Sequence, residues 1–173
     1  PILESKDKID LIEWLRHLPL LFFDDNHKTV LVHAGLHPHW NLLESQQYAC
    51  EVEELLQGNS AQQFLKVMYG DMPNKWNKNL SGYDRYRIII NCLTRIRYVG
   101  SDIELDFVSK NHPRESKNAT LIPWFEINNR ANQDYRIIFG HWSHLKFYSG
   151  NNIICLDGGC VFGGALIAID VDQ

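Results

Sequence analysis

The chain has 173 residues, and its 17 lysines and arginines against 21 aspartates and glutamates give a formal net charge of −4 at pH 7. Hydrophobic residues make up 45% and charged residues 22%, a mixture that is typical of one water-soluble globular domain. The mild, dispersed acidity argues against a large DNA-binding surface, and no apolar run reaches the roughly 20 residues that a membrane-spanning helix needs.

The first half of the chain predicts helices around one β-hairpin. Residues 7–18 carry isoleucines and leucines at helical spacing and stop before Pro19. Residues 20–23 and 29–33 predict two short strands joined by a turn at residues 25–27.

Three more helices are expected in the middle of the chain. The first has Tyr48 and Val52 on its apolar face and closes at Gly58. The second opens at Ser60, where Gln63 completes a capping-box pattern, and ends at Gly70. The third covers residues 83–98, which return to helical spacing.

The last third of the chain predicts strands. Residues 103–108 alternate, while residues 136–141, 152–157 and 165–170 are compact apolar runs. Strands at both ends with a helical insert around residues 44–98 indicate a mixed fold, α/β or α+β, in one domain over residues 1–173.

The N-terminus and the cysteines favour a cytoplasmic protein. Residues 1–5 contain no basic segment followed by an apolar stretch, so we expect no signal peptide. The cysteines form no C-x-x-C pair, and we expect mostly buried free thiols in a reducing compartment. They are Cys50, Cys92, Cys155 and Cys160.

Two histidines stand at the ends of predicted strands. His33 ends the run 30–32 and precedes Ala34-Gly35, and His141 follows Gly140 at the end of the run 137–139. The carboxyl ends of buried strands are where α/β proteins place their sites, and imidazole is a common metal ligand. A shared metal ion is therefore the working hypothesis, with a hydrogen-bonded core histidine as the alternative for each residue.

Two further features are weaker candidates. Asp157 ends a third strand and could orient a histidine ligand, although a turn aspartate that accepts backbone N–H groups is the more common case. His37 and His39 lie two residues apart in a loop, where the intervening Pro38 and the following Trp40 argue against a metal site.

Four arginines fall within 13 residues. At about 100° per residue they do not share one helix face, so one or two should turn inward. Guanidinium groups suit phosphate oxygens, and we expect at least one of the four to face phosphate. For each arginine taken singly, a surface ion pair remains the alternative. They are Arg85, Arg87, Arg95 and Arg97.

The chain closely resembles the symmetrical bis(5′-nucleosyl)-tetraphosphatases, which are diadenosine tetraphosphate hydrolases among the phosphoprotein-phosphatase-like metallophosphoesterases. The similarity runs in order over nearly the whole chain, although Gly158 stands where the family often has Thr and residues 102–120 match less well. The motifs that carry it are Val32-His33-Ala34-Gly35-Leu36, Met68-Tyr69-Gly70-Asp71-Met72-Pro73-Asn74, Thr94-Arg95-Ile96-Arg97, Phe139-Gly140-His141-Trp142 and Leu156-Asp157-Gly158-Gly159-Cys160-Val161-Phe162-Gly163-Gly164.

This resemblance implies a β-sandwich flanked by helices, a binuclear Mn²⁺ or Co²⁺ centre, and hydrolysis of diadenosine tetraphosphate to two ADP by a metal-activated water. It implies that His33 and His141 are ligands of the second metal. Arg85 would lie near the position of a phosphate-contacting, catalytic arginine, with Arg87 as its rival. Asp71 and the turn at residues 157–159 would border the site.

Three motifs of the family do not occur in this sequence, namely G-D-x-H-G, G-D-x-x-D-R-G and G-N-H-D/E. The resemblance assigns to them the first-metal ligands, the bridging aspartate, the asparagine ligand and the general-acid histidine. The chain therefore looks like the C-terminal portion of such an enzyme, without the N-terminal strands, and we expect little or no activity from it alone.

Two alternatives remain open. One is a protein phosphatase of the same superfamily, and the other is a non-catalytic remnant that binds a nucleotide or a protein. In a remnant, an exposed sheet edge where the missing strands should pair would favour self-association. We expect no DNA and no membrane among the partners.

Overall fold

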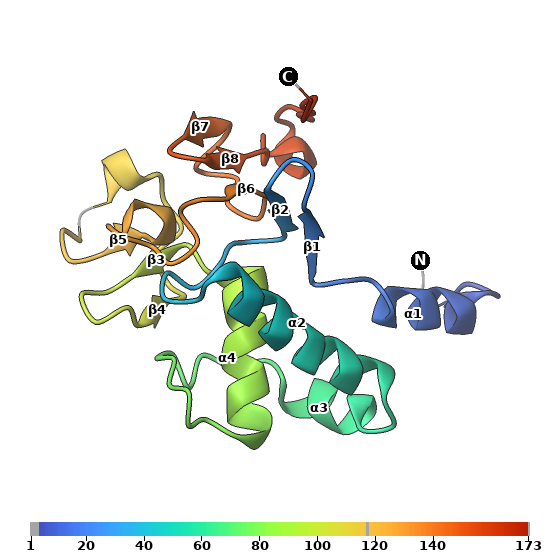
Figure 1. The fold of residues 1–173 in the computed structure, drawn as a ribbon. Coiled ribbons are helices and arrows are strands. Elements are labelled where there is room, and N and C mark those ends of the chain that lie inside the picture. Colours follow the sequence, from blue (N-terminus) through green and yellow to red (C-terminus); the bar gives the residue numbers. More distant parts are fainter. Residues whose placement is uncertain (1–3, 117, 173) are drawn as a thin grey trace.

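A computed structural model describes residues 4–116 and 118–172, so residues 1–3, which belong to the N-terminal stretch without signal-peptide features, lie outside it. The described chain is a mixed α/β structure, which confirms the predicted fold class (Figure 1). Its α-helices are α1 (Lys8–Arg16), α2 (Leu42–Gln57), α3 (Ala61–Val67) and α4 (Gly82–Arg95). Three short 3₁₀ helices cover Pro113–Glu115, Trp124–Glu126 and Cys160–Phe162.

The strands form two sheets. The larger has the order β1 (Leu21–Asp24), β2 (Thr29–Val32), β6 (Arg136–Phe139), β8 (Ile153–Cys155) and β7 (Tyr148–Gly150). The smaller has the order β4 (Leu105–Asp106), β3 (Tyr98–Val99) and β5 (Ile122–Pro123). The helices α2, α3 and α4 come between β2 and β3 in the chain and lie together on one side of the strands (Figure 1).

The three central strands of the larger sheet are parallel, and this arrangement positions the site. Strand β2 pairs in parallel with β6, and β6 pairs in parallel with β8, while the edge strands β1 and β7 run antiparallel to their neighbours. The carboxyl ends of β2, β6 and β8 therefore meet at one edge of the sheet. The predicted hairpin is confirmed, since β1 pairs with β2 across the turn.

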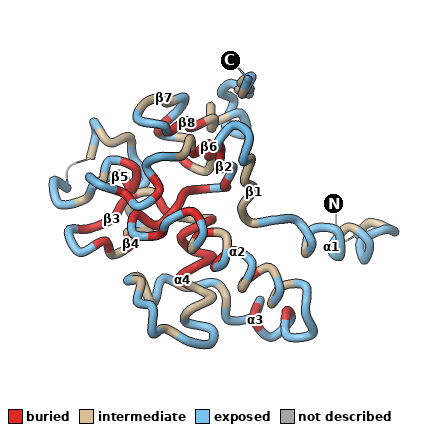
Figure 2. The backbone as a smooth tube through the Cα atoms, in the orientation of Figure 1, coloured by how far each residue is buried: buried red, intermediate tan, exposed pale blue. Residues whose placement is uncertain are grey.

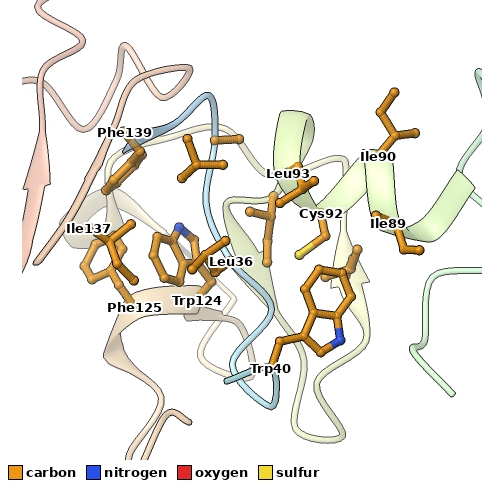
Figure 3. Close-up of a cluster of buried hydrophobic side chains, with 14 of the residues drawn as sticks. Leu36, Trp40, Ile89, Ile90, Cys92, Leu93, Trp124, Phe125, Ile137 and Phe139 are labelled. Carbon is orange, nitrogen blue, oxygen red and sulfur yellow. The ribbon is translucent and has the colours of Figure 1, made fainter. Parts of the chain in front are cut away.

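The core lies where the two sheets meet α2 and α4. Trp124 is fully buried and makes edge contacts with Phe125 and Phe139, while Leu36 and Leu93 extend the same cluster toward α4 (Figure 3). Burial of side chains of this size contributes roughly 1.5–3 kcal/mol each. The core fixes the end of α4 against the segment that follows β2, because the Ala34 N–H donates to the Leu93 carbonyl over 2.9 Å.

Helix α1 forms as its spacing predicts, but none of its residues is buried (Figure 2). Ile9 is 74% exposed, Trp14 60% and Leu15 46%. Its attachment to α2 is polar, since the Arg16 guanidinium donates to the carbonyls of Leu56 and Gln57. Helical periodicity therefore identified the helix, yet the buried face that such periodicity normally marks is missing in the described chain.

One predicted capping box and one predicted helix end are wrong. Ser60 precedes α3 with αR backbone angles and makes no capping bond with its side chain, because a capping side chain needs an extended backbone at that position. The capping box is instead at the start of α2, where Asn41 and Glu44 bond each other's backbone N–H groups. Helix α3 also ends at Val67 rather than at Gly70.

Other predicted segments are shorter than their patterns suggest. Helix α4 ends at Arg95 because Ile96 turns to an extended backbone and Tyr98 joins β3. The expected strand over residues 103–108 is reduced to β4, since Ile103 has a φ of 60°. Residues 165–170 form no strand in the described chain, where a single bridge between Ala165 and Gly159 is their only ladder contact.

Over the described residues, the helices are too short or too polar for any of them to cross a lipid bilayer.

Candidate functional site

The two strand-end histidines come together. His33 follows β2 and His141 follows Gly140 after β6, and the Nε2 atom of His33 lies 3.2 Å from the Nδ1 atom of His141. Their ring centroids are 5.0 Å apart, with the ring planes tilted by 55°. The sequence separation is 108 residues, so the parallel pairing of β2 with β6 is what joins them.

The backbone at His141 is unusual. Its φ is 63°, in the left-handed region that side chains other than glycine rarely adopt, and such positions cluster at functional sites. The preceding Gly140 donates its N–H to the His33 carbonyl over 3.0 Å, which ties the two strand ends together. The buried Nε2 atom of His141 has no hydrogen-bond partner within the described part of the chain. The fold thus holds the backbone of His141 in a sterically disfavoured conformation just after β6.

Both imidazoles are neutral near pH 7. Burial lowers the pKa of His33, with an opposing effect from the negative charge of Asp157. Burial also lowers the pKa of His141 to about 4, and the nearby positive charge of Arg97 acts in the same direction. Neutral imidazole is the form that binds metals, because the ligating nitrogen must carry a free lone pair.

The geometry of the pair fits one shared metal ion. Two nitrogens bound to the same ion at about 2.1 Å lie roughly 3.0–3.4 Å apart at octahedral or tetrahedral angles. The 3.2 Å between His33 Nε2 and His141 Nδ1 falls within that range. Across residues 4–116 and 118–172, however, no three His, Cys, Asp or Glu side chains gather closely enough to hold an ion. The described chain therefore offers two ligands and lacks the carboxylates that normally complete such a centre.

Asp157 follows β8, the third parallel strand, at the same sheet edge. Its Oδ1 atom accepts a hydrogen bond from the Gly159 N–H over 3.0 Å, as expected for a turn aspartate. Its negative charge also favours the protonated forms of His33 and Arg97, which partly offsets the lowering of their pKa values by burial. Asp157 therefore stabilises its own glycine turn and contributes negative charge beside the histidine pair.

Arg97 is the arginine that lies beside the histidines. It follows α4, and its Nη2 atom is 3.4 Å from the His141 carbonyl, to which it donates. Its guanidinium is half-buried. Burial lowers its pKa, the positive charge of Arg95 acts in the same direction, and the negative charge of Asp157 opposes them. A cation held at this position faces the space next to the paired imidazoles.

Arg95 and Asp71 form an ion pair near the same end of α4. The Arg95 Nη2 atom lies 2.8 Å from Asp71 Oδ1, and Nη1 donates to the Gly70 carbonyl. The guanidinium also lies over the rings of Tyr69 and Phe107. These contacts leave Arg95 oriented by the loop at residues 69–71, on the border of the site.

Arg85 and Arg87 lie near the start of α4. Ten residues at 1.5 Å per residue separate Arg85 from Arg95 by about 15 Å along the helix. Arg85 forms a two-point ion pair with Glu51 at 2.7 and 2.9 Å, which raises its pKa. Arg87 donates to the carbonyls of Val67 and Met72 and pairs with Asp84. Both guanidinium groups are thus engaged by protein atoms, and their catalytic role stays a prediction.

His37 is a core residue. It is 2% exposed and stacks on Trp40, and its Nδ1 atom accepts the His39 N–H. The His37 carbonyl accepts from Asn132, which ties this loop to the chain before β6. Burial, aided by His39, lowers the pKa of His37 to about 3. The side chain is therefore neutral at any pH at which the protein is normally handled.

The low pKa of His37 predicts acid sensitivity. The unfolded chain binds a proton near pH 6.5 while the folded chain does not, so stability is complete above that pH and falls as the pH drops. Because of His37, the free energy of unfolding should be about 2 kcal/mol lower at pH 5 than at pH 8. His37→Asn keeps an acceptor for the His39 N–H and removes the titration, so urea unfolding of the variant should show a correspondingly smaller loss. Equal pH slopes for the two proteins would contradict the assignment.

A cleft beside His141 was not anticipated from the sequence. It is lined by Arg97 and His141 and by basic residues of two loops, among them Lys110, Arg114 and Lys146. These residues follow no motif, and Lys146 is more than 30 positions from Lys110 and Arg114, so the structure is needed to bring the two groups together. The one available signal was the concentration of basic side chains around residues 110–114.

Comparison with known proteins gives a consistent result. The whole chain is 42% identical over 173 residues to the symmetrical bis(5′-nucleosyl)-tetraphosphatase of Thioalkalivibrio sulfidiphilus, of which it covers 64%. The proteins of the same name from Nitrosococcus oceani and Cronobacter sakazakii are 42% and 45% identical over 99% and 98% of the chain, which covers 62% and 60% of them. The chain thus spans less than two thirds of the length of these relatives. No family model matches it.

Proposed function

We propose that this chain, whose resemblance to the symmetrical bis(5′-nucleosyl)-tetraphosphatases is confirmed along its full length, is the C-terminal portion of such an enzyme. The whole protein would hydrolyse diadenosine tetraphosphate to two ADP. The observation that carries the proposal is the convergence of His33 and His141, which come from the two strand ends that match the family motifs. The domain would then be a portion of a metallophosphoesterase domain with residues 44–98 as a helical insert.

The metal centre is the first part of the proposal. His33 and His141 would hold one divalent ion, Mn²⁺ or Co²⁺, of a binuclear pair whose other ligands lie outside this chain. Such a pair, when bound, supplies an activated water and offsets the charge that develops on the phosphate. The neutral state of both imidazoles supports this role, since no proton has to leave before an ion binds.

The chain's own residues would bind and orient the polyphosphate. Arg97 faces the space beside the histidines and would bind a phosphate oxygen next to the bond that breaks. Arg95 and Asp71 would line the border of the site. Asp157 would fix the turn at residues 157–159. A cytoplasmic location is also part of the proposal, supported by four cysteines that are all free thiols. The expectation that most of them are buried is wrong, since Cys50 and Cys160 are exposed.

The role of Arg97 gives a quantitative prediction. In the longer protein, Arg97→Ala should lower kcat/KM by about 100-fold, the typical loss when a donor to developing charge is removed. Arg16→Ala removes a guanidinium that bonds only helix-end carbonyls and Glu13, and should leave kcat/KM within twofold. A steady-state assay of all variants should include Arg85→Ala, because a loss equal to that of Arg97→Ala would return the phosphate-binding role to Arg85.

The experiment that tests the function uses product analysis. The chain is joined to the part of the Thioalkalivibrio sulfidiphilus relative that it does not cover, and is incubated with Mn²⁺ or Co²⁺ and either diadenosine tetraphosphate or a phosphopeptide. We expect ADP as the sole nucleotide product and no release of phosphate from the peptide. Equal amounts of ATP and AMP, or a preference for the peptide, would overturn the proposal.

A further inference from the structure

We infer that the cleft beside His141 binds one nucleoside diphosphate arm of the substrate, with Lys110 and Arg114 on its phosphates and Phe147 against its base. The inference rests on the proposed function and extends it to residues that lie outside the shared motifs. The cleft has a volume of about 1010 Å³, and Arg97 and His141 are among the residues that line it. A nucleoside diphosphate is well within the size of ligand that a cleft of this volume accepts.

The charge of the cleft differs in sign from that of the chain. Four lysines and arginines line it against two carboxylates, Glu115 and Asp157, whereas the whole chain carries a net charge of −4. Lys110, Arg114 and Lys146 come from the segments that follow β4 and β6, and Arg97, between α4 and β3, is the one that reaches the His141 carbonyl. A concave surface with this excess of positive charge attracts a polyphosphate.

The loop cations are available to a ligand. In the described part of the chain, neither Lys110, Arg114 nor Lys146 forms an ion pair with a carboxylate, whereas Arg85, Arg87 and Arg95 each do. The polar contacts of this loop use backbone atoms, because the Lys110 carbonyl accepts from Trp142 Nε1 and the Arg114 N–H donates to His112 Nδ1. The loop is thereby fixed while the charged ends of its side chains stay free.

An aromatic side chain lies in the same wall. Phe147 follows His141 by six residues, lines the cleft and is 53% exposed, and Phe162, which is 83% exposed, lines the same cleft. Its neighbour Tyr148 packs instead against Phe125, with ring centroids 5.0 Å apart. An exposed ring beside cations is the combination that holds a base and its phosphates together.

The order of these groups matches the chemistry of a symmetrical cut. The bond that breaks lies in the middle of the four phosphates, so two phosphates and one nucleoside must lie on each side of the paired histidines. His141 and Arg97 line the cleft together with Lys110 and Arg114, so the phosphates of one arm bound there would lie near both the paired histidines and these two cations. The base of that arm would then reach Phe147.

Binding of ADP and pyrophosphate to this chain, measured by calorimetry without added metal, tests the inference. Lys110→Ala/Arg114→Ala should weaken both ligands by at least about tenfold, since charge-assisted bonds to phosphate are lost. Phe147→Ala should weaken ADP by about fivefold or more and leave pyrophosphate unchanged, because only ADP has a base to stack. Circular dichroism before each titration verifies that the variants are folded.

Two matched controls separate the cleft from general effects. Lys8→Ala/Lys66→Ala removes the same amount of charge from exposed helix positions, and Phe22→Ala removes an equally exposed ring from β1. Neither should change the dissociation constant of ADP by more than twofold. Absence of ADP binding at millimolar concentration, or equal losses in cleft and control variants, would overturn the inference. Cleft-dependent ADP binding in a chain whose longer form does not cleave diadenosine tetraphosphate would overturn only the proposed function.

Discussion

Replacing either strand-end histidine in the longer protein, His33→Asn or His141→Asn, is expected to lower the rate of diadenosine tetraphosphate hydrolysis by at least about 100-fold. The reason is geometric, because His33 Nε2 and His141 Nδ1 lie 3.2 Å apart and either substitution removes one of the two nitrogens that would bind the proposed ion. Steady-state rates at saturating Mn²⁺, together with metal content after dialysis, measure the effect.

Two controls accompany this pair. Arg87→Ala should lose far less rate than either histidine variant, since the Arg87 guanidinium is engaged by the carbonyls of Val67 and Met72. His17→Asn removes an exposed histidine of the first helical segment and should have no effect. If both strand-end variants kept near-normal rates and metal content, the assignment of His33 and His141 as ligands would be wrong.

The largest expected effect on stability is at the centre of the core. Trp124→Ala should lower the free energy of unfolding by about 3–5 kcal/mol, which is typical for truncating a fully buried aromatic side chain. The ring contacts Phe125 and Phe139, and a Cβ at Gly35 would come within 2.5 Å of it, so the backbone just after His33 packs directly on the indole. The loss is measured by urea denaturation followed by circular dichroism.

Trp14→Ala is the matched control for this prediction. Trp14 lies on α1 and is 60% exposed, so its removal should change the free energy of unfolding by less than about 0.5 kcal/mol. Similar losses for the two tryptophans would show that the core is not organised around Trp124.

The sequence predicted the parts of the fold that short-range patterns determine. The hairpin of β1 and β2 and the strands β6 and β8 follow from compact apolar runs. The histidine pair could be anticipated because both residues end such runs, and strands of this kind align their carboxyl ends when they pair in parallel. A local pattern was therefore sufficient to predict that these two histidines, which follow paired strands, lie close together.

The features that the sequence did not predict depend on contacts between residues that are far apart in the chain. Arg85 meets Glu51 across 34 residues, and no helical wheel reveals that partner. The cleft joins Lys110 to Lys146 from separate loops, so neither position was marked by spacing. Residues 165–170 have the composition of a strand, yet a strand needs a neighbour whose backbone groups pair with its own along its length, and the described chain provides only the bridge at Gly159.

Helix α1 shows that a helical pattern of apolar residues does not by itself determine burial. Its apolar spacing was read correctly as helical, but Ile9 and Leu15 remain exposed because no apolar surface of the described chain covers them. Periodicity reports which face could be buried, and packing decides whether it is.

ADP release from diadenosine tetraphosphate, measured in parallel for the chain alone and for the chain joined to the part of a relative that it does not cover, tests the account most directly. With Mn²⁺ or Co²⁺ present, the joined protein should release ADP rapidly, while the chain alone should release little or none because it would supply only two ligands, His33 and His141, of the proposed metal centre. Robust turnover by the chain alone, abolished by His33→Asn, would contradict the conclusion that it holds only half of the site.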